Sequence, residues 1–90
     1  MLVVVIGELD LVTSPVLDRH LAGAVARGRD KVVVDVGGVT FLDIRGINSL
    51  VTAHGAALAA GSALVVRGAG DLVRRLVEVC GLQDHLRLEP

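Results

Sequence analysis

Short apolar runs in this chain alternate with stretches in which apolar residues recur every three or four positions. Three runs are continuous and rich in β-branched residues: Leu2–Ile6, Lys31–Val36 and Ala63–Val66. Continuous runs of this kind are typical of strands buried in a mostly parallel sheet. We therefore expect three buried strands, the first of them ended by Gly7.

The periodic stretches between these runs predict three helices. Ser14 and Pro15 form a helix start, with a hydroxyl cap followed by proline at the first helical position. Asp43 precedes a helix of about Ile44–Ala60, and Asp71 is placed to cap the last helix. Glycines are expected to end the three helices, at Gly28, Gly61 and Gly81. The residues expected to face the core are Leu17, Leu21, Ala24, Val25, Ile47, Leu50, Val51, Leu58, Leu72, Val73, Leu76, Val77 and Cys80.

The remaining segments complete an alternating order of strands and helices. Gly37-Gly38 predicts a turn before Val39–Leu42, and Leu86–Leu88 predicts a short closing strand. Alternating strands and helices indicate an α/β protein with right-handed crossovers. We expect one domain over residues 1–90, with a mixed, mostly parallel sheet of about four strands and three or more helices.

The composition argues against two kinds of partner. Phe41 is the only aromatic residue and the formal net charge is −1, so the stacking platforms and basic surface of a nucleic-acid-binding protein are missing. Residues 46–66 carry no charged side chain, but polar residues and glycines interrupt them, which favours a buried helix and strand over membrane insertion. The first residues lack the basic segment of a signal peptide, so we expect a cytoplasmic protein.

The sequence contains no motif for catalysis or cofactor binding. Cys80 is the single cysteine, and His20, His54 and His85 are too far apart for metal-ligand spacing. Gly68-Ala69-Gly70 stands where a phosphate loop belongs, but it lacks the lysine and the third glycine of such loops. We expect no metal site, no cofactor and no enzyme activity.

The segment Phe41–Gly46 lies where a predicted strand ends and a helix begins. The first N–H groups of a helix lack partners within it, and Asp43 is placed to accept from the amides near Arg45 and Gly46. An ordinary capped helix start explains this segment on local evidence. An exposed junction is also a natural binding site for an anion or an acidic side chain, so both interpretations stay open.

Several segments taken together resemble one known family. They are Gly7-Glu8-Leu9-Asp10, the strand Val32–Asp35, and Val39–Asp43 followed by Gly46. In this order and spacing they are similar to the STAS domain, the fold of bacterial anti-sigma factor antagonists. Gly81-Leu82 is similar to the family's ending, and the resemblance covers nearly the whole chain.

The resemblance implies a binding module. Members of the family dock on an anti-sigma factor, often a serine kinase, and thereby free a sigma factor for transcription. Matching positions would place the partner contacts at Asp10, Asp43, Ile44, Arg45 and Gly46. Ile44 either anchors the partner or packs inward, and Arg45 either pairs with an acidic group or is solvated.

The chain departs from the family at the regulatory switch. In the family, the kinase phosphorylates a serine or threonine directly after the aspartate, which adds roughly 1.5 to 2 negative charges to the interface. Here Ile44 stands at that position and Arg45 replaces the next hydroxyl residue. The resemblance therefore implies that the usual phospho-acceptor is absent, with Thr40 and Ser49 as weak candidates to replace it.

A second departure concerns the first strand. The family commonly begins with an additional strand, whereas this sequence starts almost directly at Leu2. The first predicted strand then becomes a sheet edge, and an uncovered apolar edge invites pairing with another chain. A homodimer through this edge is therefore expected as one possible partner interaction.

Two other functions stay open on the sequence. Some STAS-like domains are accessory subunits of lipid-transport ATPase complexes, and that role requires a different partner. The third function is a small-ligand sensor that uses the loop Gly68–Asp71.

Overall fold

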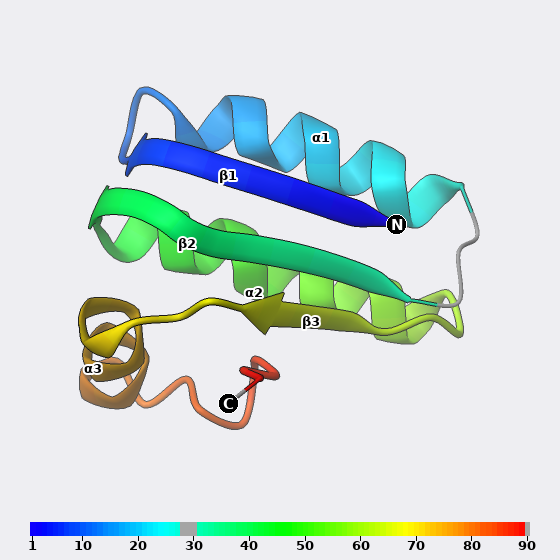
Figure 1. Ribbon diagram of the computed structural model, residues 1–90. Helices are drawn as coiled ribbons and strands as arrows, with labels where there is room; N and C mark the ends of the chain where they lie inside the picture. Colours follow the sequence, from blue (N-terminus) through cyan, green and yellow to red (C-terminus); the bar gives the residue numbers. More distant parts are fainter. Residues whose placement is uncertain (28–30, 90) are drawn as a thin grey trace.

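Three parallel strands form the sheet of this protein. The computed structural model describes residues 1–27 and 31–89, so the expected helix end at Gly28 lies outside the described residues. Strands β1 (Leu2–Leu9), β2 (Val32–Leu42) and β3 (Leu64–Arg67) are hydrogen-bonded in the order β1-β2-β3 (Figure 1). The predicted α/β class and the parallel pairing are confirmed.

The two helices that connect these strands, α1 (Ser14–Ala26) and α2 (Ile44–Ala59), lie on one face of the sheet (Figure 1). A third helix, α3 (Asp71–Val79), comes after β3. Helices α1 and α2 lie side by side across this face, and α3 follows the end of β3 (Figure 1). Crossovers between parallel strands are right-handed, and the strand order advances in one direction, so the connecting helices fall on the same side.

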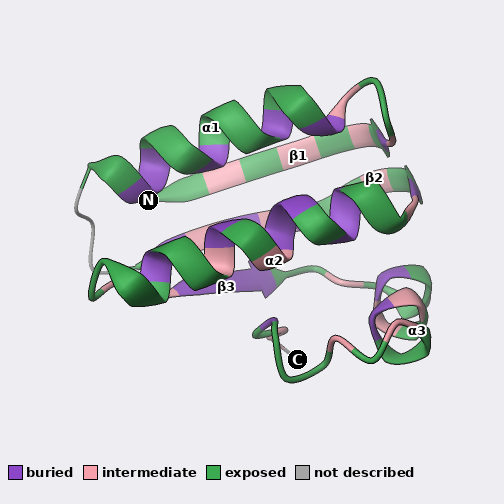
Figure 2. Cartoon of the chain, turned by 180° about the vertical axis from the view of Figure 1, so that it is seen from behind, coloured by how far each residue is buried: buried purple, intermediate pink, exposed green. Residues whose placement is uncertain are grey.

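The hydrophobic core lies between this face and the helices. Figure 2 shows buried stripes along α1 and α2 where they face the sheet. Leu72 and Leu58 were expected in the core, but they are 53% and 59% exposed, so these two predictions are wrong. Each helix buries only a narrow stripe of its surface, and these two residues lie outside it. The fully buried large side chains are Leu21, Val32, Val34, Ile47, Leu50, Leu64, Val65, Val66 and Val77.

The opposite face of the sheet is open along β1. Leu2, Val4 and Ile6 are 50%, 58% and 78% exposed, while the residues between them are partly buried. The prediction that this strand is buried is therefore wrong, because a continuous apolar run does not reveal how many faces are covered. Gly7 does not end the strand, since β1 continues through it with a φ of 94°.

Strand β2 continues through the glycine pair that predicted a turn. Its register against β1 shifts between Val4 and Ile6 and again between Gly7 and Glu8, so the glycines form an irregular stretch within one strand. Asp35 stabilises this stretch, because its Oδ1 accepts a hydrogen bond of 2.9 Å from the N–H of Gly37. Asp35 Oδ2 also accepts from Nε of Arg67 on β3, at 3.1 Å.

The predicted closing strand Leu86–Leu88 is reduced to one bridge between Val66 and Leu88. The N–H of Val66 donates to the carbonyl of Arg87, and the N–H of Glu89 donates to the carbonyl of Val66, both at 2.8 Å. Strand β3 has only four residues and offers a short edge for pairing. In the described part of the chain, the sheet therefore has three strands where about four were expected.

Two predicted helix caps are displaced by one residue. Thr13 occupies the N-cap position of α1 in place of Ser14, and Gly70 occupies that of α3 in place of Asp71. The carboxylate of Asp10 already accepts from the amides just before α1, so that helix does not depend on a hydroxyl cap. Within the described residues, no helix combines the length and the apolar composition that crossing a membrane requires.

The hydrogen bonds of Asp35 make the stability of the fold depend on pH. The N–H of Gly37, and to a smaller extent the side chain of Arg67, hold the pKa of this carboxyl below its ordinary value of 3.8. Its stabilising effect is therefore complete above that value and is lost as the pH falls through the lowered pKa. We expect the melting temperature of Asp35→Ala to fall less steeply below about pH 4 than that of the wild type.

The control for this measurement is Asp84→Ala, which removes an exposed carboxylate near the end of the chain. Its melting temperature should follow the wild-type pH dependence. Equal slopes for Asp35→Ala and the wild type would contradict the assignment.

Candidate functional site

Asp10 organises the turn after β1. Its Oδ1 accepts hydrogen bonds from the N–H of Val12 at 2.9 Å and the N–H of Thr13 at 3.1 Å. These two N–H groups lower the pKa of the Asp10 carboxyl, and that of Thr13 has the larger effect. The Thr13 hydroxyl donates to the carbonyl of Glu8 at 2.7 Å, which fastens the turn to the strand. The carboxylate therefore shapes the turn whether or not it also contacts a partner.

Asp43 has the corresponding role at the start of α2. Its Oδ1 accepts from the N–H groups of Arg45 at 2.9 Å and Gly46 at 3.4 Å, so the predicted N-cap is confirmed. The N–H of Asp43 donates to the carbonyl of Leu9 at 3.1 Å. Because Leu9 precedes Asp10, this bond brings the two aspartate segments together at one end of the sheet.

Gly46 allows α2 to approach β1 closely. It is buried, and a Cβ at this position would lie 2.5 Å from Cδ1 of Leu42 and 2.9 Å from Cβ of Leu9. The structure thus gives Gly46 a packing function at the base of the site. Direct contact between Gly46 and a partner stays a prediction.

Ile44 and Arg45 lie on the outside of the first turn of α2. Ile44 is 42% exposed, so the structure favours the interpretation in which its side chain is available to a partner. Arg45 is exposed and forms no ion pair with any described residue. It also lines a groove of about 520 Å³ between α1 and α2.

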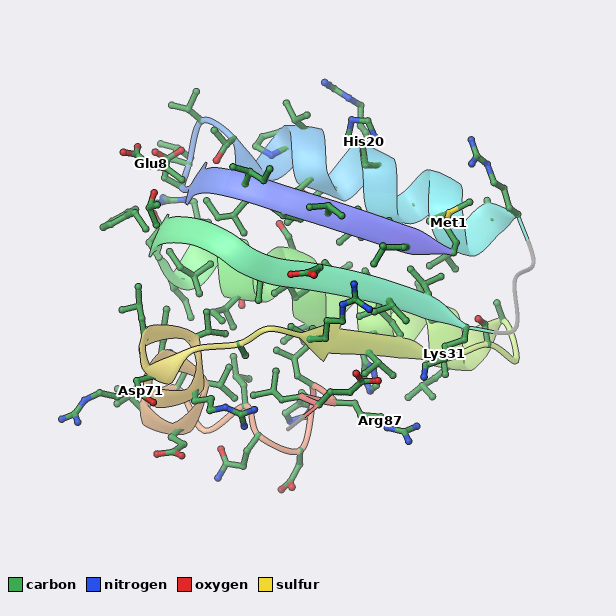
Figure 3. All side chains as sticks on the ribbon, viewed as in Figure 1. Met1, Glu8, His20, Lys31, Asp71 and Arg87 are labelled. Atoms are coloured by element: carbon green, nitrogen blue, oxygen red, sulfur yellow. The ribbon has the colours of Figure 1, made fainter. Side chains whose placement is uncertain are left out.

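Three exposed apolar residues near these positions were missed as site residues. Leu11 and Val12, in the turn after β1, are 60% and 79% exposed, and Phe41 on β2 is 49% exposed. An apolar pair inside a predicted loop was the available signal, because loops of this length are usually polar. Phe41 is paired in register with Glu8, whose position at this end of β1 is labelled in Figure 3. We call the exposed set the loop-end surface, and it consists of Leu11, Val12, Phe41, Ile44 and Arg45.

The two weak phospho-acceptor candidates differ in their accessibility. Ser49 is 6% exposed, and its hydroxyl donates to the carbonyl of Arg45 at 3.2 Å. Thr40 is exposed on β2. In the part of the chain that the structure describes, no three His, Cys, Asp or Glu side chains come together as a metal site.

Comparisons with known proteins agree with this fold. The family described as "Mlab, STAS domain" matches residues 1–89 of the chain. The anti-sigma-B factor antagonist of Staphylococcus aureus is 32% identical over 82 residues, which make up 91% of this chain and 76% of that protein. The crystal structure of an anti-sigma factor antagonist from Mycobacterium paratuberculosis is 30% identical, with a TM-score of 0.87, and the match covers 99% of this chain and 75% of that one.

A more distant structure has the same fold. The Bacillus anti-sigma factor antagonist SpoIIAA, in its unphosphorylated form, is 13% identical with a TM-score of 0.76, covering 99% of this chain and 77% of that one. SpoIIAA has also been solved in a phosphorylated form. The named relatives favour an antagonist over the other two functions that the sequence left open.

The packing at Gly46 yields a test of how the site is built. We expect Gly46→Ala to lower the free energy of unfolding by about 1–3 kcal/mol, because the new methyl group overlaps Leu9 and Leu42. Gly55→Ala in the same helix is the matched control, since a Cβ there meets nothing within 4 Å. It should raise stability by up to about 1 kcal/mol through helix propensity. Denaturant unfolding measures both, and an equal gain in the two variants would refute the packing function.

Proposed function

Since the chain belongs to the STAS domain family and is similar to anti-sigma factor antagonists over most of its length, we propose that it binds an anti-sigma factor of the serine-kinase type. By occupying that protein it would free a sigma factor and so regulate transcription. We assign it to the cytoplasm, where this partner acts, and we assign it no enzyme activity.

The observation that carries this proposal is the loop-end surface. Four large apolar side chains with exposures from 42% to 79% gather around the ends of β1 and β2. Exposed apolar groups close together usually mark a protein interface, in which a few of them supply most of the binding energy. Arg45 adds a cation that is available to a carboxylate of the partner.

Asp10 and Asp43 support this surface from behind. Their carboxylates accept main-chain hydrogen bonds and thereby fix the turn that carries Leu11 and Val12 and the helix start that carries Ile44. A rigid, preformed surface loses less entropy when it binds. We propose that both aspartates act mainly in this way, with partner contact at their remaining oxygens.

Binding can be measured by affinity capture from the native cell with Ile44→Asp as the variant. A charge at this position should weaken capture of an anti-sigma kinase at least about tenfold, because it is desolvated within the interface. Leu58→Asp is the matched control, since Leu58 is 59% exposed near the other end of α2, about 20 Å from Ile44 along the helix. Capture of an ATPase subunit in place of a kinase would contradict the proposal and support the transport role.

We also propose that the usual off-switch is missing. Ile44 cannot accept a phosphate, and the buried hydroxyl of Ser49 is already bonded to the chain. After incubation with the kinase and ATP, mass spectrometry should find no phosphate within residues 40–49. Ile44→Ser restores a hydroxyl next to the cap and should become phosphorylated. Stoichiometric phosphate on Thr40 or Ser49 of the wild type would overturn this proposal.

The free edge of β1 supports a homodimer as a second proposal. Among the described residues, this strand pairs with β2 on one side only, and its apolar side chains are among the most exposed there. Strand pairing between two copies would use an edge that is otherwise open to any other strand.

A further inference from the structure

Within the residues that the structure describes, the main chain of β1 has hydrogen-bonding groups without a strand partner. The N–H of Val33 on β2 donates to the carbonyl of Met1 at 2.8 Å. In a parallel pair, the main-chain N–H and C=O groups of successive residues point to alternate edges of the strand. Those of the odd-numbered residues of β1 therefore point toward β2. The N–H and C=O groups of Leu2, Val4 and Ile6 therefore face the free edge. An edge of this kind is a template for another strand.

Helix α1 leaves this edge accessible. A hollow of about 370 Å³ runs along β1 and is also lined by Val16 and His20 of α1. A second hollow, of about 400 Å³, continues at the amino end of β1 and is lined by Arg19 and Arg27. Figure 3 shows His20 on α1 beside β1, at the side away from β2.

We infer that two copies pair through β1 in antiparallel orientation, with Val4 opposite Val4 of the second copy. This inference rests on the homodimer proposed above and specifies its geometry. Leu2 then lies opposite Ile6 of the second copy, and residues opposite each other have numbers that add up to 8. All the edge-facing groups of Leu2, Val4 and Ile6 find a partner in this register.

The neighbouring registers that keep the open faces on one side are less favourable. Opposite residues in an antiparallel pair share a face, so the sum of their numbers must be even for the exposed side chains to meet. In the register in which the numbers of opposite residues add up to 6, Ile6 has no residue of the second strand opposite it. A sum of 10 places Glu8 opposite Leu2 and includes Gly7, whose φ of 94° departs from extended backbone.

The charges also favour the antiparallel orientation. Glu8 lies at the carboxyl end of β1, is exposed and forms no ion pair with a described residue. Antiparallel pairing brings it toward the amino end of β1 of the second copy, where Arg19 and Arg27 line the hollow. Parallel pairing in register would place the two Glu8 carboxylates together, which is unfavourable. A second copy therefore complements this edge in charge as well as in main-chain hydrogen bonding.

The association is expected to depend on concentration. The pair involves five residues of each strand and buries less than the roughly 1,600 Å² of a standard interface. Sedimentation of a concentration series should show the 9.3 kDa chain passing into a species of twice that mass. Val4→Lys, which sets two like charges opposite each other, should raise the dissociation constant at least about tenfold. Leu58→Lys on α2 is the matched control and should leave it unchanged, since Leu58 is 59% exposed away from β1.

Cysteine crosslinking tests the register in a Cys80→Ser background. Residues that exchange hydrogen bonds across an antiparallel pair have Cα atoms about 5.5 Å apart, within the range of a disulfide. Val4→Cys should therefore crosslink efficiently, whereas Val5→Cys should not. Leu2→Cys should crosslink with Ile6→Cys when the two proteins are mixed, and neither should do so alone.

The outcomes separate the two proposals. A protein that stays monomeric at all concentrations overturns both the homodimer and its geometry. A dimer that crosslinks through Val5→Cys, or in any pattern other than the expected one, overturns the register and leaves the homodimer standing. Neither result bears on capture of the anti-sigma factor, which uses residues at the loop ends.

Discussion

The candidate site depends on the contact between the first turn of α2 and the end of β1. The N–H of Asp43 reaches the carbonyl of Leu9 because Gly46 has no side chain to keep the helix away. This contact fixes where the helix begins relative to the strand. It thereby decides that the turn after Leu9 and the start of α2 present their side chains to the same region of solvent.

The one-sided arrangement of the helices has a wider consequence. Parallel sheets are usually covered on both faces. Here α1 and α2 cover one face, so β1 has an open face as well as an open edge (Figure 1). Near β3 the open face is instead polar, with the ion pairs Asp35–Arg67 and Lys31–Glu89. Most of the exposed large apolar side chains of the described residues therefore lie on or next to β1 and at the loop ends, where partners are proposed to bind, and the others lie singly on the helices.

Local chemistry explains which parts of this structure were predictable. The three helices, the parallel strands and the Asp43 cap follow from periodicity and from the preference of helix starts for carboxylates. The exposure of Ile6 did not follow, because an apolar strand has the same sequence whether one face or two are covered. The continuation of β2 through Gly37-Gly38 depends on Asp35 and Arg67 from two strands, and no local pattern reports such a contact.

The site was predictable only in part for a related reason. Resemblance to a family identifies positions that align with its motif, such as Asp43 and Ile44, but it does not report what surrounds them. The exposure of Leu11 and Val12 results from the turn that Asp10 holds, and it emerges only when that turn is placed beside α2. Gly46 shows the converse, because a motif position lies beneath the surface and acts through packing.

The absence of a hydroxyl at position 44 changes how binding is controlled. Under the proposal that no phosphate is added here, occupancy of the loop-end surface would follow the concentrations of the chain and its partner. The proposed strand pairing ends at Ile6, before Glu8 and Phe41, so the two surfaces share no residue. An antiparallel dimer would carry its two loop-end surfaces at opposite ends, where two separate partners can bind. Self-association would then let one dimer hold two partner molecules, and it would not compete with them for the loop-end surface.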